Sequence, residues 1–224
     1  MTRGILLAGN ESSLSVAIAT EAAKRVEQFA AAFIPNRFAA SGGEKNLSYG
    51  ESFIPLSWNP GSPVSARTLI LAAENRLEQI HEAILVCAPP SIRKSPGDLT
   101  SSEIEMMINE HIKGWFFLVK ELIAIFRLRQ AGTLGLVLSE LEPGNGKDES
   151  PDILGPSASA SFRVFAQNII ACSQHEPFQV MGFSAPAAAD NNAFGSFVFK
   201  LLEEGGKRNT GKWHKFGRGL LFGR

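Results

Sequence analysis

The sequence contains little cysteine, and neither sign of charge is in excess. Its two cysteines, Cys87 and Cys172, stand far apart, in no spacing typical of a zinc site or a disulfide framework. We therefore predict no metal site and two reduced thiols in the cytoplasm. Basic and acidic side chains balance at 22 each, which gives no long-range attraction for nucleic acid. No apolar run approaches the length of a membrane span or resembles a signal peptide, so we expect a soluble protein that binds neither nucleic acid nor membrane.

The chain does show a regular alternation of short apolar runs and helical periodicities. Six apolar runs predict strands, at residues 4–9, 29–35, 52–58, 83–87, 133–139 and 178–183. Between them, apolar residues recur every three or four positions and predict helices, at residues 11–29, 64–80, 100–130, 157–173 and 192–204. This alternation predicts a single α/β domain over residues 1–224, with a doubly wound, mainly parallel Rossmann-type sheet and helices on both faces.

The C-terminal tail, residues 205–224, carries seven basic residues, six of them lysine or arginine and one histidine, interleaved with aromatic residues. Such a mixture can bind phosphate or nucleic acid. A solvated extension explains it better, because the rest of the sequence offers no matching basic surface. We predict a last strand at residues 219–222.

The turn from the first strand into the first helix is the first candidate site. Free N–H groups and the helix dipole attract phosphate to a helix N-terminus. Only Gly9 is present where dinucleotide-binding loops carry several glycines, and Ser13 and Ser15 stand at further positions. Small hydroxyl residues fit such a loop and donate hydrogen bonds. A serine-capped helix start that binds nothing is an equally good interpretation.

Several segments together resemble the short-chain dehydrogenase/reductase family. The run Gly9-x5-Ser15-x-Ala17 resembles the cofactor loop of its enoyl-acyl-carrier-protein reductase branch. Leu85-Val-Cys-Ala-Pro-Pro is similar to the family's Asn-Asn-Ala-Gly segment, and His111-Ile-Lys-Gly-Trp-Phe-Phe to its Asn-x-x-Gly-x-Phe. Residues 133–139 resemble the strand that ends on the catalytic serine, here Ser139. The resemblance implies NAD(P) binding by seven residues, namely Gly9, Ser13, Leu14, Ser15, Arg37, Cys87 and Ala88.

The sequence departs from that family at its catalytic pair, Tyr-x-x-x-Lys. In the family a lysine lowers the pKa of the tyrosine, which acts as general acid and base. This chain has one tyrosine, Tyr49, outside the matching helix, and our alignment places Ser157 and Ser161 at the two positions. We therefore expect a family-like protein with a site for NAD(P) but without the usual oxidoreductase activity. A non-catalytic scaffold or regulatory subunit with a vestigial pocket is the alternative.

A third interpretation keeps catalysis and replaces the missing tyrosine. His111 titrates near neutrality in its unperturbed form, so His111 or Ser139 is the candidate for an unusual proton donor in an NADP-dependent oxidoreductase. A structural histidine on the helix face, hydrogen-bonded to nearby backbone, is the better explanation of His111. Arg37 follows the second strand, where arginine suits the 2′-phosphate of NADP better than the ribose hydroxyl of NAD; a solvated loop arginine is the alternative.

The resemblance also implies a homodimer or homotetramer through the helices at 102–130 and 157–173. Core packing explains the aromatic residues of these helices equally well.

Overall fold

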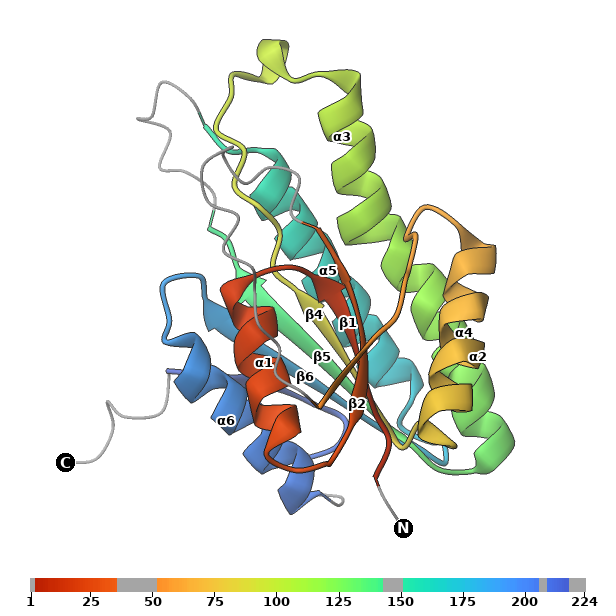
Figure 1. Ribbon diagram of the computed structural model, residues 1–224. Coiled ribbons are helices and arrows are strands. Elements are labelled where there is room, and N and C mark those ends of the chain that lie inside the picture. Colours follow the sequence, from red (N-terminus) through yellow and green to blue (C-terminus); the bar gives the residue numbers. More distant parts are fainter. Residues whose placement is uncertain (1–2, 36–51, 143–150, 206–208, 218–224) are drawn as a thin grey trace, which may run out of the picture.

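The computed structural model describes residues 3–35, 52–142, 151–205 and 209–217. Over these residues the chain forms one seven-stranded sheet in the order β3-β2-β1-β4-β5-β6-β7 (Figure 1), and every pair of neighbouring strands is parallel. The strands are β1 Ile5–Asn10, β2 Phe29–Ile34, β3 Phe53–Pro55, β4 Glu82–Cys87, β5 Thr133–Glu140, β6 Gln179–Pro186 and β7 Lys212–Lys215. The predicted single domain with a doubly wound parallel sheet is confirmed.

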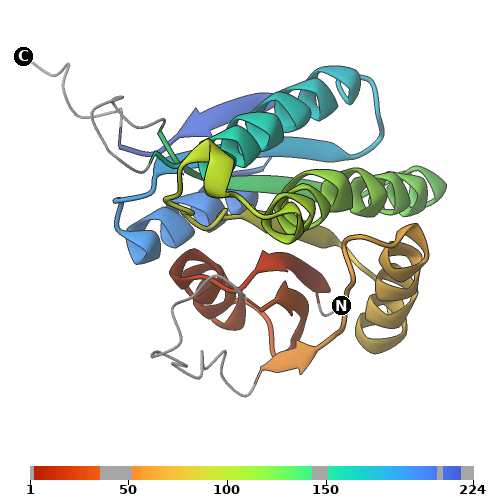
Figure 2. The same ribbon diagram turned by 90° about the horizontal axis from the view of Figure 1, so that it is seen from above.

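Helices cover both faces of the sheet (Figure 2). On one face lie α1 Ser13–Ala23 and α6 Asn191–Glu204, and on the other lie α2 Pro63–Leu77, α4 Gly114–Arg129 and α5 Leu154–Cys172. The helix α3, Ser101–Ile108, begins after a short 3₁₀ turn at Pro96–Asp98 and projects beyond the carboxyl ends of the strands (Figure 1). A π-helical turn, Asn109–Lys113, joins α3 to α4. No helix among the described residues is long and apolar enough to cross a membrane.

The core consists of two layers, one on each face of the sheet. Every residue of β1 and of β4 is buried, as expected for central parallel strands, which are covered on both faces. Side chains alternate between the layers along each strand. In β4, for example, Leu85 and Cys87 pack toward α4 and α5, whereas Ile84 and Val86 pack toward α1 and α6.

Several boundaries differ from the sequence-based predictions. The third strand is limited to Phe53–Pro55, whereas residues 52–58 were predicted. The first helix ends at Ala23 and not at residue 29, because Phe29 begins β2 and pairs with Phe53 of β3. The tail contributes β7 at Lys212–Lys215, and the strand predicted at residues 219–222 lies outside the described residues.

Candidate functional site

The carboxyl ends of β1 and β4 form the point at which the sheet changes direction. From β1 the chain continues to β2 and β3 on one side, and β4 then pairs with β1 on its other side. Ligands of doubly wound proteins bind in the crevice outside the strand ends at such a point. Gly9 and Asn10 end β1, Cys87 ends β4, and Ala88 follows it. The structure thus brings the predicted residues Gly9, Cys87 and Ala88 together.

Gly9 is required by the packing of β1 against β4. A Cβ atom at this position would lie 2.3 Å from the carbonyl oxygen of Val86. Real Cβ atoms do not approach a carbonyl oxygen this closely, and neighbouring strands in the core have little room to separate. The strand packing therefore explains this glycine without a ligand.

The side chains of Ser12 and Ser15 form hydrogen bonds within the first turn of α1. Ser12 is the N-cap, and its Oγ accepts the N–H of Ser15 at 3.1 Å, an arrangement typical of helix starts. The Ser15 hydroxyl is buried and donates to the carbonyl oxygen of Asn10 at 2.6 Å, while its Oγ lies 2.9 Å from that of Ser12. The proton of Ser15 is thus used inside the protein, so this serine shapes the turn and does not donate to a ligand.

Ser13 and Leu14 supply the donors that remain at this helix start. Within the described chain, no acceptor is present for their backbone N–H groups, which are the first two of α1. The Ser13 Oγ accepts a hydrogen bond from Asn191 Nδ2 at 2.8 Å, which leaves its own proton available. Two backbone N–H groups and one hydroxyl at a helix N-terminus suit one anionic group such as a phosphate.

Asn10 joins the ends of the two central strands. Its Nδ2 donates to the carbonyl oxygen of Ala88 at 2.6 Å, and its Oδ1 accepts the N–H of Ala88 at 3.1 Å. The sequence analysis did not single out this residue, although an amide at the end of a buried strand is an unusual position.

Cys87 is fully buried, and burial raises the pKa of its thiol well above the usual range. The thiol therefore stays protonated. Of Cys87 and Ala88, only Ala88 lies at the crevice.

At the end of β5, Ser139 and Glu140 point to opposite faces of the sheet. Ser139 is half-buried and lies on the face of α1 and α6, because side chains alternate along a strand. Glu140 forms an ion pair with Arg163 of α5. Ser159, one helical turn before Arg163, is buried, and its Oγ accepts the N–H of Leu141 at 3.2 Å. Ser159 and Arg163 are therefore the residues that α5 presents to the end of β5.

Ser157 and Ser161 lie on another face of α5. Ser157 is exposed and donates to the carbonyl oxygen of Ile153 at 2.6 Å. Both serines line an outer hollow that they share with Phe116 and Val164. Sequence reasoning missed Ser159 and Arg163, whose four-residue spacing was the available signal.

His111 lies in the π-helical turn between α3 and α4 and is 2% exposed. Its carbonyl oxygen accepts a hydrogen bond from Trp115 Nε1 at 3.0 Å, and its Nδ1 is buried without a partner among the described residues. Burial lowers the pKa of His111 to about 4. The imidazole is therefore neutral at neutral pH and holds no excess proton for transfer to a ligand.

The remaining predicted site residue, Arg37, lies outside the described residues, as does Tyr49. Among the described residues, no group of histidine, cysteine, aspartate and glutamate side chains could hold a metal ion.

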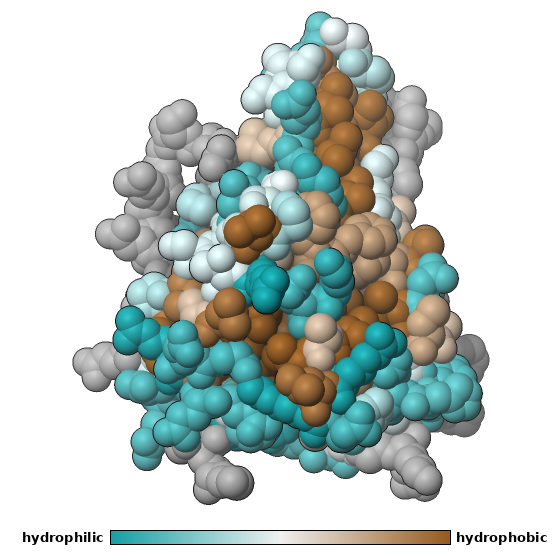
Figure 3. All heavy atoms as spheres, turned by 90° about the vertical axis from the view of Figure 1, so that its right-hand side faces the viewer, coloured by the Kyte–Doolittle hydropathy of each residue, from teal (hydrophilic) through white to brown (hydrophobic). Residues whose placement is uncertain are grey.

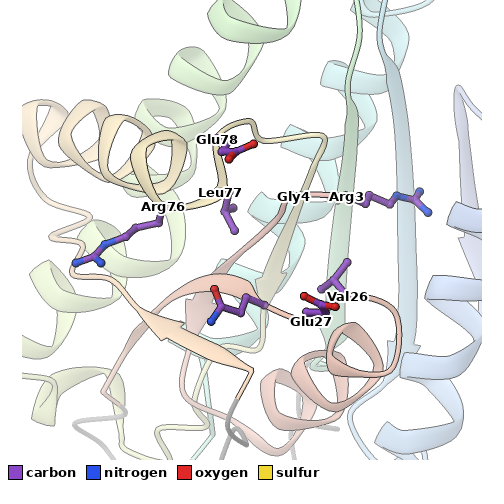
Figure 4. Close-up of a pocket in the computed structure, with 8 residues that line it drawn as sticks. Arg3, Gly4, Val26, Glu27, Arg76, Leu77 and Glu78 are labelled. Carbon is purple, nitrogen blue, oxygen red and sulfur yellow. The ribbon is translucent and has the colours of Figure 1, made fainter. Parts of the chain in front are cut away.

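A separate hollow of about 190 Å³ lies at the amino ends of the strands. It is lined by Arg3 and Gly4, and by Leu77 and Glu78 at the end of α2 (Figure 4). It is on the edge of the sheet opposite the carboxyl ends of β1 and β4.

Comparison with known proteins identifies the fold. No protein-family model and no curated protein sequence matches the chain. Solved structures do. A short chain dehydrogenase from Mycobacterium smegmatis superposes with a TM-score of 0.75 at 11% identity, over 96% of this chain and 91% of that one. Levodione reductase gives 0.74 at 11% identity, over 96% and 95% of the two chains. An NADH-dependent reductase solved in complex with NAD gives 0.73 at 11% identity, over 96% and 94%. The chain therefore has the short-chain dehydrogenase/reductase fold.

Proposed function

We propose that this protein binds a nicotinamide dinucleotide, NADP or NAD, in the crevice at the carboxyl ends of β1 and β4. The observation that carries the proposal is the start of α1 at this crevice, where the Ser13 and Leu14 N–H groups and the Ser13 hydroxyl remain available. These groups would hold the pyrophosphate, because they are fixed donors at the positive end of a helix dipole. The likeness of the fold to that of a reductase solved in complex with NAD also supports dinucleotide binding. Arg37 is the proposed contact to a 2′-phosphate, which favours NADP.

A bound NADPH or NADH would supply a hydride, but the described residues at the carboxyl ends of β1, β4 and β5 offer no suitable proton donor. No tyrosine or lysine occurs from residue 151 to residue 172. The Ser159 Oγ accepts the N–H of Leu141, but a serine hydroxyl is too weak an acid to act at neutral pH without an adjacent base, and Arg163 is paired with Glu140. His111 is neutral at physiological pH, which weakens the alternative of an oxidoreductase with His111 as its acid. A serine such as Ser139 needs an adjacent base to exchange a proton at neutral pH. We propose that the usual reduction reactions of this fold are absent or slow.

The test is a titration with NADPH and NADH, followed by calorimetry, on three variants of α1. Ser13→Pro removes one N–H and the hydroxyl, yet proline is favoured at the first position of a helix, and Ser12 already has the extended backbone that precedes proline well. We expect about tenfold weaker binding, which corresponds to about 1.4 kcal/mol. Ser13→Ala, which removes only the hydroxyl, should fall between this variant and wild type. Thr20→Ala, on an exposed part of the same helix, is the matched control and should bind as wild type does. Equal binding by all variants would exclude this helix start as the pyrophosphate site.

The second candidate is a non-catalytic scaffold or regulatory subunit whose crevice is vestigial. The Asn10 side chain forms hydrogen bonds with the backbone of Ala88 across the crevice, and the Ser15 hydroxyl donates to the carbonyl oxygen of Asn10. Part of the polar surface of the crevice therefore has its hydrogen bonds made without a ligand. Failure of both dinucleotides to bind at millimolar concentration would favour this candidate over the first.

We also propose that the protein forms a homodimer or homotetramer through α4 and α5. Phe116 and Val164, both more than half exposed, line an outer hollow of about 740 Å³ with the small residues Ser157, Ala160 and Ser161. On the side of the molecule formed by α2, α3 and α4, apolar surface gathers along the projecting part and at the centre of the face (Figure 3). Val164→Asp should convert the oligomer to a monomer in light scattering. Val64→Asp, a 72% exposed position on α2, is the control, because α2 is outside the proposed interface. A wild-type monomer at micromolar concentration would contradict the proposal.

The location of the protein remains a proposal. We place it in the cytoplasm, and the support is that Cys87 and Cys172 are both free thiols, as is usual in a reducing compartment.

A further inference from the structure

A second hollow lies at the carboxyl ends of β5, β6 and β7, and its volume is about 350 Å³, within the range of small-molecule sites. It is lined by residues of the strand ends and of the connections that follow them, namely Glu140, Glu142, Ser184, Pro186, Ala189, Lys215, Phe216 and Gly217. The lining combines carboxylates, one ammonium group and an apolar wall.

One of the carboxylates is neutralised within the protein. Glu140 forms an ion pair with Arg163, and the buried side chain of Ser184 lies near it. Burial alone would raise the pKa of Glu140, but these two partners and the charge of Lys215 outweigh burial and hold the pKa below its usual range. The Ser184 Oγ accepts a further hydrogen bond from Trp213 Nε1 at 3.0 Å. Glu140 is thus a fixed anion whose charge Arg163 balances.

Lys215 and Glu142 are the two charges that remain to face a ligand. Both are exposed, and neither forms an ion pair with another described residue, although the charge of Lys215 also helps to lower the pKa of Glu140. Lys215 ends β7, next to Ser184 of β6, and Glu142 follows β5. The hollow therefore presents one cation and one anion, carried by different strands.

The apolar wall is formed by Pro186, Ala189 and Phe216. The Phe216 ring is fixed, because its centroid lies 5.5 Å from those of Phe194 and Phe197 of α6. A rigid aromatic wall gives contact area at little cost in side-chain entropy.

We propose that this hollow binds a small zwitterion of the α-amino acid class. The carboxylate of the ligand would face Lys215, its ammonium would face Glu142, and an apolar side chain would lie against Phe216. A phosphate ester fits less well, because its second negative charge would lie beside Glu142, and Lys215 is the one cation of this lining. An uncharged apolar ligand would leave Lys215 and Glu142 partly desolvated and unpaired, which is costly. The proposal does not depend on dinucleotide binding at β1 and β4.

The test uses the protein without dinucleotide and measures binding of L-leucine by calorimetry and ligand-observed NMR. N-acetyl-leucine, which keeps only the carboxylate, and leucine amide, which keeps only the ammonium, should each bind about tenfold more weakly or not at all, since each loses one charge pair. Lys215→Gln and Glu142→Gln should each weaken L-leucine binding by a similar factor. Lys212→Gln, on the same strand but outside the lining of this hollow, is the control and should leave binding unchanged.

Two results would overturn the proposal. One is the absence of saturable binding for each of L-alanine, L-leucine and L-phenylalanine at millimolar concentration with correctly folded protein, as judged by circular dichroism. The other is binding of leucine amide or N-acetyl-leucine as tight as that of L-leucine. In a variant that carries both Lys215→Glu and Glu142→Lys, recovery of binding relative to the single charge reversals would support the proposed pairing.

Discussion

Replacing Gly9 by alanine tests whether this glycine serves the packing of the sheet. The added Cβ would lie 2.3 Å from the carbonyl oxygen of Val86, and 3.2 Å from its carbonyl carbon. An ordinary contact needs about 3.4 Å or more, so β1 and β4 would have to separate by roughly 1 Å at the centre of the sheet. Because such a core resists overpacking, we expect a loss of about 2–4 kcal/mol of unfolding free energy. The measurement is equilibrium unfolding in urea.

Gly135→Ala is the matched control for this prediction. Gly135 lies in β5 of the same sheet, and a Cβ there would meet its nearest neighbour, a side-chain atom of Ile84, at 3.6 Å. That is ordinary contact, so we expect a change within about 1 kcal/mol. If the two variants unfold at the same urea concentration with the same slope, then steric packing against Val86 does not explain Gly9.

Three further predictions concern buried charges and catalysis. The carboxylate of Glu21 is hydrogen-bonded to Lys24, Arg25 and Ser196, and its pKa is about 2 because these partners outweigh its burial. Glu21→Gln should lower the free energy of unfolding by about 2–3 kcal/mol at pH 7, and this difference should disappear as the pH falls from 4.5 toward 2. A constant difference across that range would refute the assignment. His111 has a pKa of about 4 in the folded state and 6.5 in the unfolded state, so unfolding takes up a proton between these pH values. The free energy of unfolding of wild type should therefore fall by up to about 3 kcal/mol from pH 6.5 to pH 4. His111→Gln should remove that part of the acid sensitivity, and an unchanged pH profile would show that another group causes it. A panel of ketones, alcohols and enoyl thioesters with NADPH should show no appreciable turnover, since the missing general acid is worth about 10²–10⁴-fold; fast turnover that His111→Ala abolishes would instead make His111 the proton carrier.

The sequence predicted the architecture because each central strand is a short apolar run followed by a helical periodicity. It placed the end of the first helix too late, since Val26 and Phe29 continue the helical spacing while Phe29 in fact pairs with Phe53 of β3. Such a boundary depends on a partner strand from another part of the chain. The strand β7 was missed at its true position for a similar reason. Trp213 packs over Gly182, where a Cβ would lie 2.2 Å from its ring, and neither segment alone contains that complementarity.

The candidate site was predictable only in its location. The sequence placed Gly9, Ser13, Ser15 and Ala88 at the strand ends, but hydrogen-bond partners decide what each residue can do. The Ser15 hydroxyl is used by Asn10, whereas that of Ser13 is not. A motif cannot reveal this difference, because both residues are serines in the same helical turn.

The π-helical turn that buries His111 was likewise invisible in the sequence. Its residues 109–113 have the spacing of an ordinary helix, and only the packing of that turn places the imidazole out of reach of water. The low pKa that follows from burial changes this histidine from a candidate acid into a neutral group.

The most direct test of the account is a ¹H–¹⁵N NMR titration of the labelled protein with NADPH. We predict that the backbone amide signals of Ser13 and Leu14 shift in a saturable manner, because these N–H groups gain a pyrophosphate acceptor, while the same sample reduces no substrate of the panel. Unchanged Ser13 and Leu14 signals in the presence of saturating NADPH would contradict dinucleotide binding at this crevice.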